Sequence, residues 1–219
     1  MYLDEYKRWM AADLEDADLK PELAKIEGND DEIKDRFAVA LKFGTAGLRG
    51  VLGAGTNRMN IYVVRQATQG LANWVKTQGG NQTVAISYDS RIKSDVFAKT
   101  AAGVLAANGI KAYVFESLRP TPELSYAVRK LGCIAGINVT ASHNPPEYNG
   151  YKVYWEDGAQ VTPPHDTSIM AEVAKVTSFD QVKTMDKAAA IEAGLYNVIS
   201  DEVEEGYFGE LRKLSIHPE

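Results

Sequence analysis

The feature that most constrains this 219-residue chain is a regular alternation of β-rich runs and helical repeats between residues 60 and 139. Apolar side chains recur every three to four positions in the helical runs, and short β-rich runs lie between them. The expected helices are 60–77, 94 to a stop at Gly109, and 121–130, and the expected strands are 83–88, 111–115 and 133–139. Strands separated by helices of ten or more residues form crossover units. We therefore predict an α/β fold, a three-layer αβα domain with a mainly parallel sheet between helices.

Two later segments extend this pattern. Residues 148–155 contain Asn149-Gly150, a turn signal, and we expect a further strand there that pairs antiparallel with its neighbour. The sheet would then be mixed. Residues 162–176 predict a last helix, and the five glycines within 43–55 predict a functional loop or a tight hairpin.

A new element is expected at the C-terminal end. Across residues 201–214, apolar Val203, Tyr207, Leu211 and Leu214 recur at helical spacing. Only five residues follow that could cover this stripe. The pattern favours the front part of something longer, although the helix could instead pack back on the sheet or on another copy.

The first forty residues are rich in carboxylates and helix formers. Tyr2, Tyr6 and Trp9 recur at helical spacing, which predicts two or three short surface helices with their acidic side chains in solvent. The run of Asp13, Asp16 and Asp18 lacks the glycine-containing twelve-residue loop of a calcium site. We expect a solvated face there.

Composition excludes several classes of function. The net charge of -6 argues against a general attraction to nucleic acid or anionic lipid. No run of residues is apolar enough to span a membrane, and the charged N-terminus does not resemble a secretory signal. The single Cys133 lies in an apolar run, so we expect it to be buried in a reducing compartment. A cytoplasmic protein without a membrane or nucleic acid partner is predicted.

The chemistry is concentrated in residues 140–152, where an apolar strand delivers small and polar side chains to its carboxyl end. Open α/β sheets bind ligands at that edge, so Ser142 is predicted to be an exposed hydroxyl there. In an extended segment adjacent side chains point to opposite faces, which would place His143 badly for deprotonating Ser142. The flanks Ala141 and His143 also exclude a nucleophile elbow. A serine hydrolase is therefore disfavoured.

Other phosphate and metal motifs are missing. Gly53-Ala54-Gly55 lacks the third glycine of a dinucleotide fingerprint, and the sequence contains no P-loop pattern. His143, His165 and His217 are too dispersed to predict a zinc site by spacing. Any anion site must be local.

Four segments carry a resemblance: residues 43–50, 88–91, 140–145 and 149–152. In order and spacing they resemble the first domain of the α-D-phosphohexomutases, in the phosphoglucomutase branch that includes phosphopentomutases. Members of that family have four domains, of which the first three share a mixed sheet between helices. The resemblance covers essentially the whole chain and implies domain I at 1–199, followed by the opening helix of a truncated second domain at 200–219.

The resemblance implies a role for each site residue. The serine matching Ser142 carries a phosphoryl group that it donates to a sugar monophosphate, giving a bisphosphate. Arg49 and Arg91 match arginines near that phosphoserine, and an arginine fork suits phosphate oxygens. Lys152 matches a proposed general base and His143 a proposed general acid or base, and which of them is the base stays open. Thr45 and Asn144 are expected to contact phosphate or substrate.

The resemblance also implies partners that lie outside this chain. Magnesium would bind the phosphorylated Ser142 and three aspartates of an Asp-Gly-Asp-x-Asp-Arg loop in domain II, which this sequence lacks. We expect a sugar bisphosphate activator, a sugar phosphate substrate with glucose favoured over mannose and pentose, and no turnover by the chain without domains II–IV. Self-association through the 201–214 stripe is expected of such a truncation. The alternative is a free-standing module that binds phosphosugars or a protein partner.

Overall fold

The computed structural model describes residues 1–44 and 47–217, in which six strands form one sheet. The strand order is β1-β5-β4-β2-β3-β6. Four neighbours, β4, β2, β3 and β6, are parallel, while β5 runs antiparallel to both β4 and β1. This confirms the mixed, mainly parallel sheet. The bounds are β1 (Gly47–Val51), β2 (Thr83–Tyr88), β3 (Lys111–Val114), β4 (Ala135–Val139), β5 (Tyr148–Trp155) and β6 (Tyr196–Val198).

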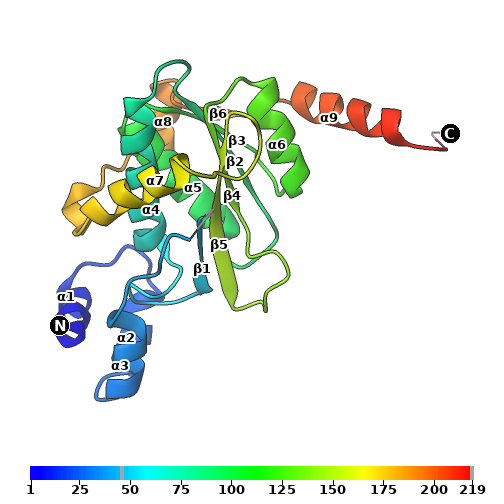
Figure 1. The fold of residues 1–219 in the computed structure, drawn as a ribbon. Coiled ribbons are helices and arrows are strands. Elements are labelled where there is room, and N and C mark those ends of the chain that lie inside the picture. Colours follow the sequence, from blue (N-terminus) through cyan, green and yellow to red (C-terminus); the bar gives the residue numbers. More distant parts are fainter. Residues whose placement is uncertain (45–46, 218–219) are drawn as a thin grey trace.

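Helices cover both faces of the sheet, which confirms the three-layer architecture (Figure 1). One face carries α4 (Ile61–Thr77), α5 (Ser94–Ala107), α7 (His165–Lys175) and α8 (Lys187–Glu192). Its core includes Ile86, Ile137 and Tyr151 from the sheet. The other face carries α6 (Thr121–Lys130), where Leu124 and Val128 pack with Ala85 and Tyr154. A short 3₁₀ turn at Phe179–Gln181 links α7 to α8.

Ser94 and Thr121 are residue types that predict helix N-caps, but neither caps its helix, for a reason that bears on the site. The N-cap of α5 is Lys93, not Ser94, and that of α6 is Pro120, not Thr121. The Ser94 hydroxyl donates to Asp89 Oδ1, and the Thr121 hydroxyl accepts from Asn138 Nδ2. Both hydroxyls therefore bond to tertiary partners at the sheet edge and not to the backbone of the helix that each begins.

The first forty residues form α1 (Tyr2–Ala11), α2 (Leu19–Lys25) and α3 (Asp30–Phe37), as predicted. Their inner faces join the main core, since Trp9 is buried and lies edge-on to Phe37 at 5.8 Å and Tyr62 at 5.3 Å. The expectation that the acidic run is solvated is wrong for Asp16. That side chain is only 12% exposed because the Lys93 ammonium lies 2.7 Å away, and the same ammonium lies 2.9 Å from Asp18.

Helix α9 (Asp201–Leu214) begins after β6 and extends away from the rest of the protein (Figure 1). Its first turns are docked: Val203 packs with Phe115, Ala127 and Ile199, and Glu204 pairs with Arg119 at 3.0 Å. Further along, Phe208, Leu211 and Leu214 are 43%, 42% and 79% exposed. The predicted apolar stripe therefore packs back on the domain at its start and stays uncovered at its end.

Two smaller expectations concern single segments. Cys133 is buried, as predicted, and burial raises the pKa of its thiol. Among the described residues, the helices are all too short or too polar to cross a bilayer.

Candidate active site

Ser142 lies in a tight turn that follows β4 at the carboxyl edge of the parallel strands. Its φ of 57° is left-handed, an uncommon conformation for a residue with a side chain. The Ser142 amide donates to the Thr140 hydroxyl at 2.9 Å, and the Asn144 amide donates to the Ala141 carbonyl at 3.2 Å. The Ser142 side chain is exposed. The turn thus presents a hydroxyl to solvent from a bonded backbone.

The prediction that Ser142 and His143 point apart is wrong. Ser142 Oγ lies 3.3 Å from His143 Nδ1, within reach of a hydrogen bond. The prediction assumed an extended segment, but the left-handed turn at Ser142 brings the two side chains to the same side. A histidine is therefore close enough to exchange a proton with this hydroxyl. The pair alone does not make a hydrolase triad.

Arg91 binds the backbone of the loop that carries Ser142, residues 140–149, called here the Ser142 loop. Its Nη2 atom donates to the carbonyls of Ser142 at 2.7 Å and Asn144 at 2.6 Å. Its Nη1 atom donates to the carbonyls of Pro145 at 2.9 Å and Tyr148 at 3.0 Å. The four terminal N–H donors of the guanidinium are thereby engaged with protein oxygens.

The turn that carries Arg91, residues 89–94, is itself tied to the Ser142 loop. Asp89 Oδ1 accepts from the Arg91 amide at 3.0 Å and from the Ser94 hydroxyl at 2.8 Å. From the other side, Asn149 Nδ2 donates to the Ile92 carbonyl and to Ser94 Oγ, both at 3.0 Å. The Arg91 turn and the Ser142 loop consequently form one bonded unit.

Arg49 and Lys152 lie on one face of the sheet beside this unit. In the antiparallel pairing of β1 with β5, Arg49 is opposite Gly150 and Gly47 is opposite Lys152. Residues paired in this way, and residues two apart on a strand, share a face. This is the α6 face, where α6 packs mainly on β2 and β4 and reaches β5 at Tyr154. Both cations lie on β1 and β5, at the edge of the sheet away from β6.

The two cations differ in their contacts. Arg49 is exposed, and Nη1 donates to Asn144 Oδ1 at 3.0 Å. Within residues 1–44 and 47–217, the Lys152 ammonium makes no hydrogen bond or ion pair. Next to it, Tyr151 is fully buried, and burial raises the pKa of its phenol well above the usual value of 10. Tyr151 is thus not a candidate to exchange a proton at this site.

A cavity of about 400 Å³ opens at Ser142, lined also by Ser90, Arg91, Asn144 and Pro146. Its size suits a small polar molecule. The structure thus brings Ser142, His143, Asn144 and Arg91 together, with Arg49 reaching the loop through Asn144. Thr45, expected to contact phosphate, lies outside the described residues.

The sequence does not predict that Asp89, Ser94 and Asn149 build the site. For Asp89 the sequence does hold a signal. An aspartate two residues before Arg91 in a turn can accept a hydrogen bond from the Arg91 amide. The sequence pattern predicts Asn149 to be half of a turn. Its side chain instead bridges the two loops from inside strand β5.

The described residues do not by themselves make a magnesium site. Nowhere among them do three His, Cys, Asp or Glu side chains gather closely enough to hold a metal ion. The carboxylate beside Ser142, that of Asp89, is occupied by Arg91 and Ser94.

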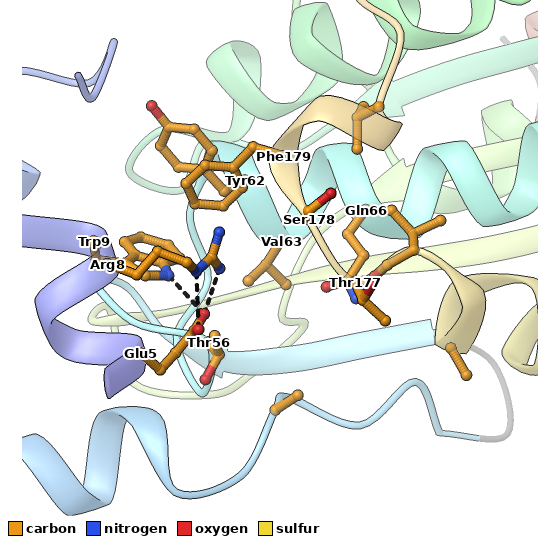
Figure 2. Close-up of a pocket in the computed structure, with 14 residues that line it drawn as sticks. Glu5, Arg8, Trp9, Thr56, Tyr62, Val63, Gln66, Thr177, Ser178 and Phe179 are labelled. Carbon is orange, nitrogen blue, oxygen red and sulfur yellow. Dashed lines mark hydrogen bonds and ion pairs between the residues drawn. The ribbon is translucent and has the colours of Figure 1, made fainter. Parts of the chain in front are cut away.

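A second cavity, of about 350 Å³, lies between α1, the start of α4 and residues 174–182 (Figure 2). Aromatic Trp9, Tyr62 and Phe179 line it. Its charged pair is internal, since Arg8 Nε donates to Glu5 at 2.9 Å and the guanidinium lies over the Phe179 ring. Arg8, the cation that lines this cavity among the described residues, is therefore already paired.

Comparisons with known proteins agree with this geometry. Residues 40–180 match the family model described as phosphoglucomutase/phosphomannomutase, alpha/beta/alpha domain I. The chain is 36% identical to a phosphopentomutase of Pongo abelii over 87% of this chain and 32% of that protein. It is 39% identical to a phosphoglucomutase of Staphylococcus saprophyticus over 81% of this chain and 32% of that protein.

A solved structure of a putative phosphomannomutase from Thermus thermophilus superposes with a TM-score of 0.66 at 28% identity. The match covers 80% of this chain and 36% of that one. The chain thus spans about a third of the length of the relatives it matches. The family match takes in β1 with Arg49, the Arg91 turn and the Ser142 loop. This chain belongs to the phosphoglucomutase/phosphomannomutase family and contains its first α/β/α domain.

Proposed function

We propose that this chain is the phosphoserine-bearing part of a phosphoglucomutase-type enzyme that interconverts glucose 1-phosphate and glucose 6-phosphate. The observation that carries the proposal is the Ser142 hydroxyl, exposed on a bonded turn at the mouth of a cavity, with Arg49 bonded to Asn144 of the same loop. Phosphoryl transfer needs positioning and neutralisation of spreading negative charge more than covalent assistance. A fixed oxygen among cations meets both needs.

The reaction proceeds in two transfers. In the first, the phosphorylated Ser142 loses its phosphoryl group to a sugar hydroxyl: the sugar O–P bond forms and the Ser142 Oγ–P bond breaks. The proton of the sugar hydroxyl passes to a base, and the leaving serine oxygen takes up a proton. In the second, Ser142 takes the other phosphoryl group from the sugar bisphosphate, so that the phosphate has moved between carbon 1 and carbon 6. A free sugar bisphosphate would serve as activator by charging Ser142.

The proton-moving groups are His143 and Lys152. His143 Nδ1 lies 3.3 Å from Ser142 Oγ and is placed to return a proton to the leaving serine oxygen. Lys152 is proposed as the base for the sugar hydroxyl. Arg49, with Asn144 as its neighbour, places positive charge beside the transferred group. Thr45 is proposed to add a phosphate contact.

Several features of the proposal lie beyond this chain. Residues 1–199 are proposed as domain I and 200–219 as the opening helix of domain II, with domains II–IV supplying the remaining contacts. Magnesium would bind the phosphorylated Ser142 together with ligands from those domains, and the chain alone would not turn over substrate. The uncovered Phe208, Leu211 and Leu214 of α9 would promote self-association of the isolated chain. A cytoplasmic location is proposed with this activity.

The alternative substrates are a pentose phosphate and a mannose phosphate. The names of the relatives support keeping them, since these include a phosphopentomutase and a putative phosphomannomutase. Both alternatives use the same serine, so they change the sugar and not the transfer. A non-catalytic module that binds phosphosugars is the second class of function, and it would retain ligand binding without forming a phosphoserine.

The test compares the full-length protein with its Ser142→Ala variant in the conversion of glucose 1-phosphate, with magnesium and a trace of glucose bisphosphate present. We expect the variant to lose turnover and to gain no phosphoryl mass from the bisphosphate. Ser90→Ala is the matched control, because Ser90 is an exposed serine in the same cavity. It should still be labelled. Labelling of the Ser142→Ala variant, or undiminished turnover, would exclude the phosphoserine mechanism.

A further inference from the structure

The left-handed conformation of Ser142 needs external support. A residue with a side chain pays about 1–2 kcal/mol to adopt a φ near 57°. Within the Ser142 loop, the Ser142 amide bonds the Thr140 hydroxyl and the Asn144 amide bonds the Ala141 carbonyl, and neither bond holds the Ser142 carbonyl. The carbonyl side of the turn is held from outside the loop, by Arg91.

Arg91 suits this support in number and direction of donors. Its guanidinium is 13% exposed, and its terminal nitrogens bind carbonyls spread from Ser142 to Tyr148. A guanidinium is a planar fork with five N–H groups, whereas an ammonium has three donors on a single atom. Four separate carbonyls can therefore be held by arginine but not by lysine.

The position of the guanidinium is itself fixed. Asp89 Oδ2 lies 3.5 Å from Arg91 Nε, while Asp89 Oδ1 holds the Arg91 amide and the Ser94 hydroxyl. Lys93, in the same turn, is anchored to Asp16 and Asp18 of the N-terminal region. The turn that carries Arg91 is thus attached both to the sheet and to the N-terminal helices.

We propose that Arg91 is a positioning residue, which holds the Ser142 loop in its phosphoryl-accepting conformation and does not itself bind phosphate. This replaces the expectation that Arg49 and Arg91 act alike on phosphate, and it rests on the proposed function. Arg49 makes a single bond to the loop and keeps donors for an anion, whereas the terminal donors of Arg91 are engaged by four carbonyls. Arg91 acts on the reaction through the orientation of Ser142.

The first experiment compares Arg91→Lys with Arg49→Lys in the full-length enzyme. We expect Arg91→Lys to lower kcat by about 10- to 100-fold, because a small displacement of a reacting oxygen costs that much, with KM for the sugar phosphate changed less than about twofold. Arg49→Lys should instead raise KM, because it touches the anion directly. A raised KM with unchanged kcat in Arg91→Lys would show Arg91 to be a phosphate ligand and overturn the proposal.

The second experiment needs no activity, so it separates this proposal from the proposed function. Amide hydrogen exchange is measured on the 219-residue chain in both variants. Arg91→Lys should accelerate exchange at residues 142–148, and Arg49→Lys should leave it near the wild-type rate. If Arg91→Lys does not fold, Ser94→Ala removes one bond to Asp89 and should give a smaller acceleration at the same residues. Unchanged exchange at the Ser142 loop in a folded variant would overturn the positioning role.

Discussion

The Ser142 loop and helix α9 both follow parallel strands, β4 and β6, yet they are held in opposite ways. The loop is fixed by directional hydrogen bonds from Thr140, Arg91 and Asn149. Helix α9 is attached mainly by apolar contacts in its first two turns, through Val203 and Tyr207, and then leaves the domain. Directional bonds specify one geometry, whereas a small apolar contact tolerates adjustment. The domain thus carries the precise part of the site within itself and leaves the orientation of α9 weakly specified.

The strict geometry of the Ser142 loop is tested most severely at Gly150, where the neighbouring backbone leaves no room for a side chain. A Cβ there would lie 2.5 Å from the carbonyl oxygen of Thr140 and 2.9 Å from that of Leu48. We expect Gly150→Ala to lower the free energy of unfolding by about 3 kcal/mol, because backbone must move to accommodate it. Urea denaturation checks this. Gly79→Ala, with open space around it, should change stability by less than about 0.5 kcal/mol, and an equal effect of the two variants would refute the strict geometry.

The apolar attachment of α9 is tested next, at Val203. This side chain is buried among Phe115, Ala127 and Ile199, so Val203→Ala should cost about 1–2 kcal/mol and speed hydrogen exchange along α9. The Ser142 loop should exchange at its normal rate. Leu214→Ala is the control, since Leu214 is largely exposed and should contribute less than about 0.5 kcal/mol. Faster exchange in the loop would mean that the two regions are not independent.

Two glycines of α9 sharpen the comparison further. A Cβ on Gly206 would lie 2.5 Å from Tyr126 Oη, while one on Gly209 would meet nothing within 4 Å. Gly209→Ala should therefore stabilise the helix by up to about 1 kcal/mol through its propensity alone. Gly206→Ala should lose most of that gain, because Tyr126 must shift. Thermal unfolding of the two variants gives the difference, and identical shifts would show that α9 does not dock where Tyr126 lies.

The smallest effect is expected at Glu123, beneath the α9 attachment. Burial raises the pKa of this carboxyl above its ordinary value of 4.5, with a further rise from Glu204 and an opposing effect of Arg119. The folded chain therefore binds this proton more tightly than the unfolded chain does. The stability that Glu123 contributes is present below 4.5 and is lost as the pH rises through the folded pKa.

Glu123→Gln should accordingly be more stable than wild type at about pH 7, by less than about 1 kcal/mol, and equal to it at about pH 4. Urea denaturation at the two pH values measures the difference. An advantage that is the same at both values, or that is larger in acid, would contradict the raised pKa. Glu205→Gln is the control, because Glu205 is an exposed carboxylate of α9, and it should show no such dependence on pH.

The sequence pattern predicted the regular elements closely. Strand β2 and helix α9 have the bounds that the sequence pattern predicts, and β5 pairs antiparallel as expected, although Asn149-Gly150 lies inside the strand and forms no turn. Such elements are specified by local spacing, and tertiary packing reinforces the same choice. The α/β class and the uncovered end of the α9 stripe therefore followed from the sequence.

The details of the site could not be predicted in the same way. The proximity of His143 to Ser142 depends on a left-handed residue that is not glycine, and no local signal marks it. The bonds of Arg91 reach more than fifty residues along the chain, and the pair of Lys93 with Asp16 spans 77. Only the folded sheet brings these groups together, so residue types at the site were foreseeable and their contacts were not.

The anchoring of Lys93 bears on how this protein can be shortened. The family model begins at residue 40, so an expression vector designed on those bounds would discard Asp16, Asp18 and the aromatic rings of the N-terminal helices. Such a product would keep every residue expected to handle phosphate. It would nevertheless lose the ion pairs of Lys93 with Asp16 and Asp18, which anchor the turn that carries Arg91. Removing the residues before position 40 should therefore lower the rate of phosphoryl transfer, although every side chain expected to contact phosphate is retained.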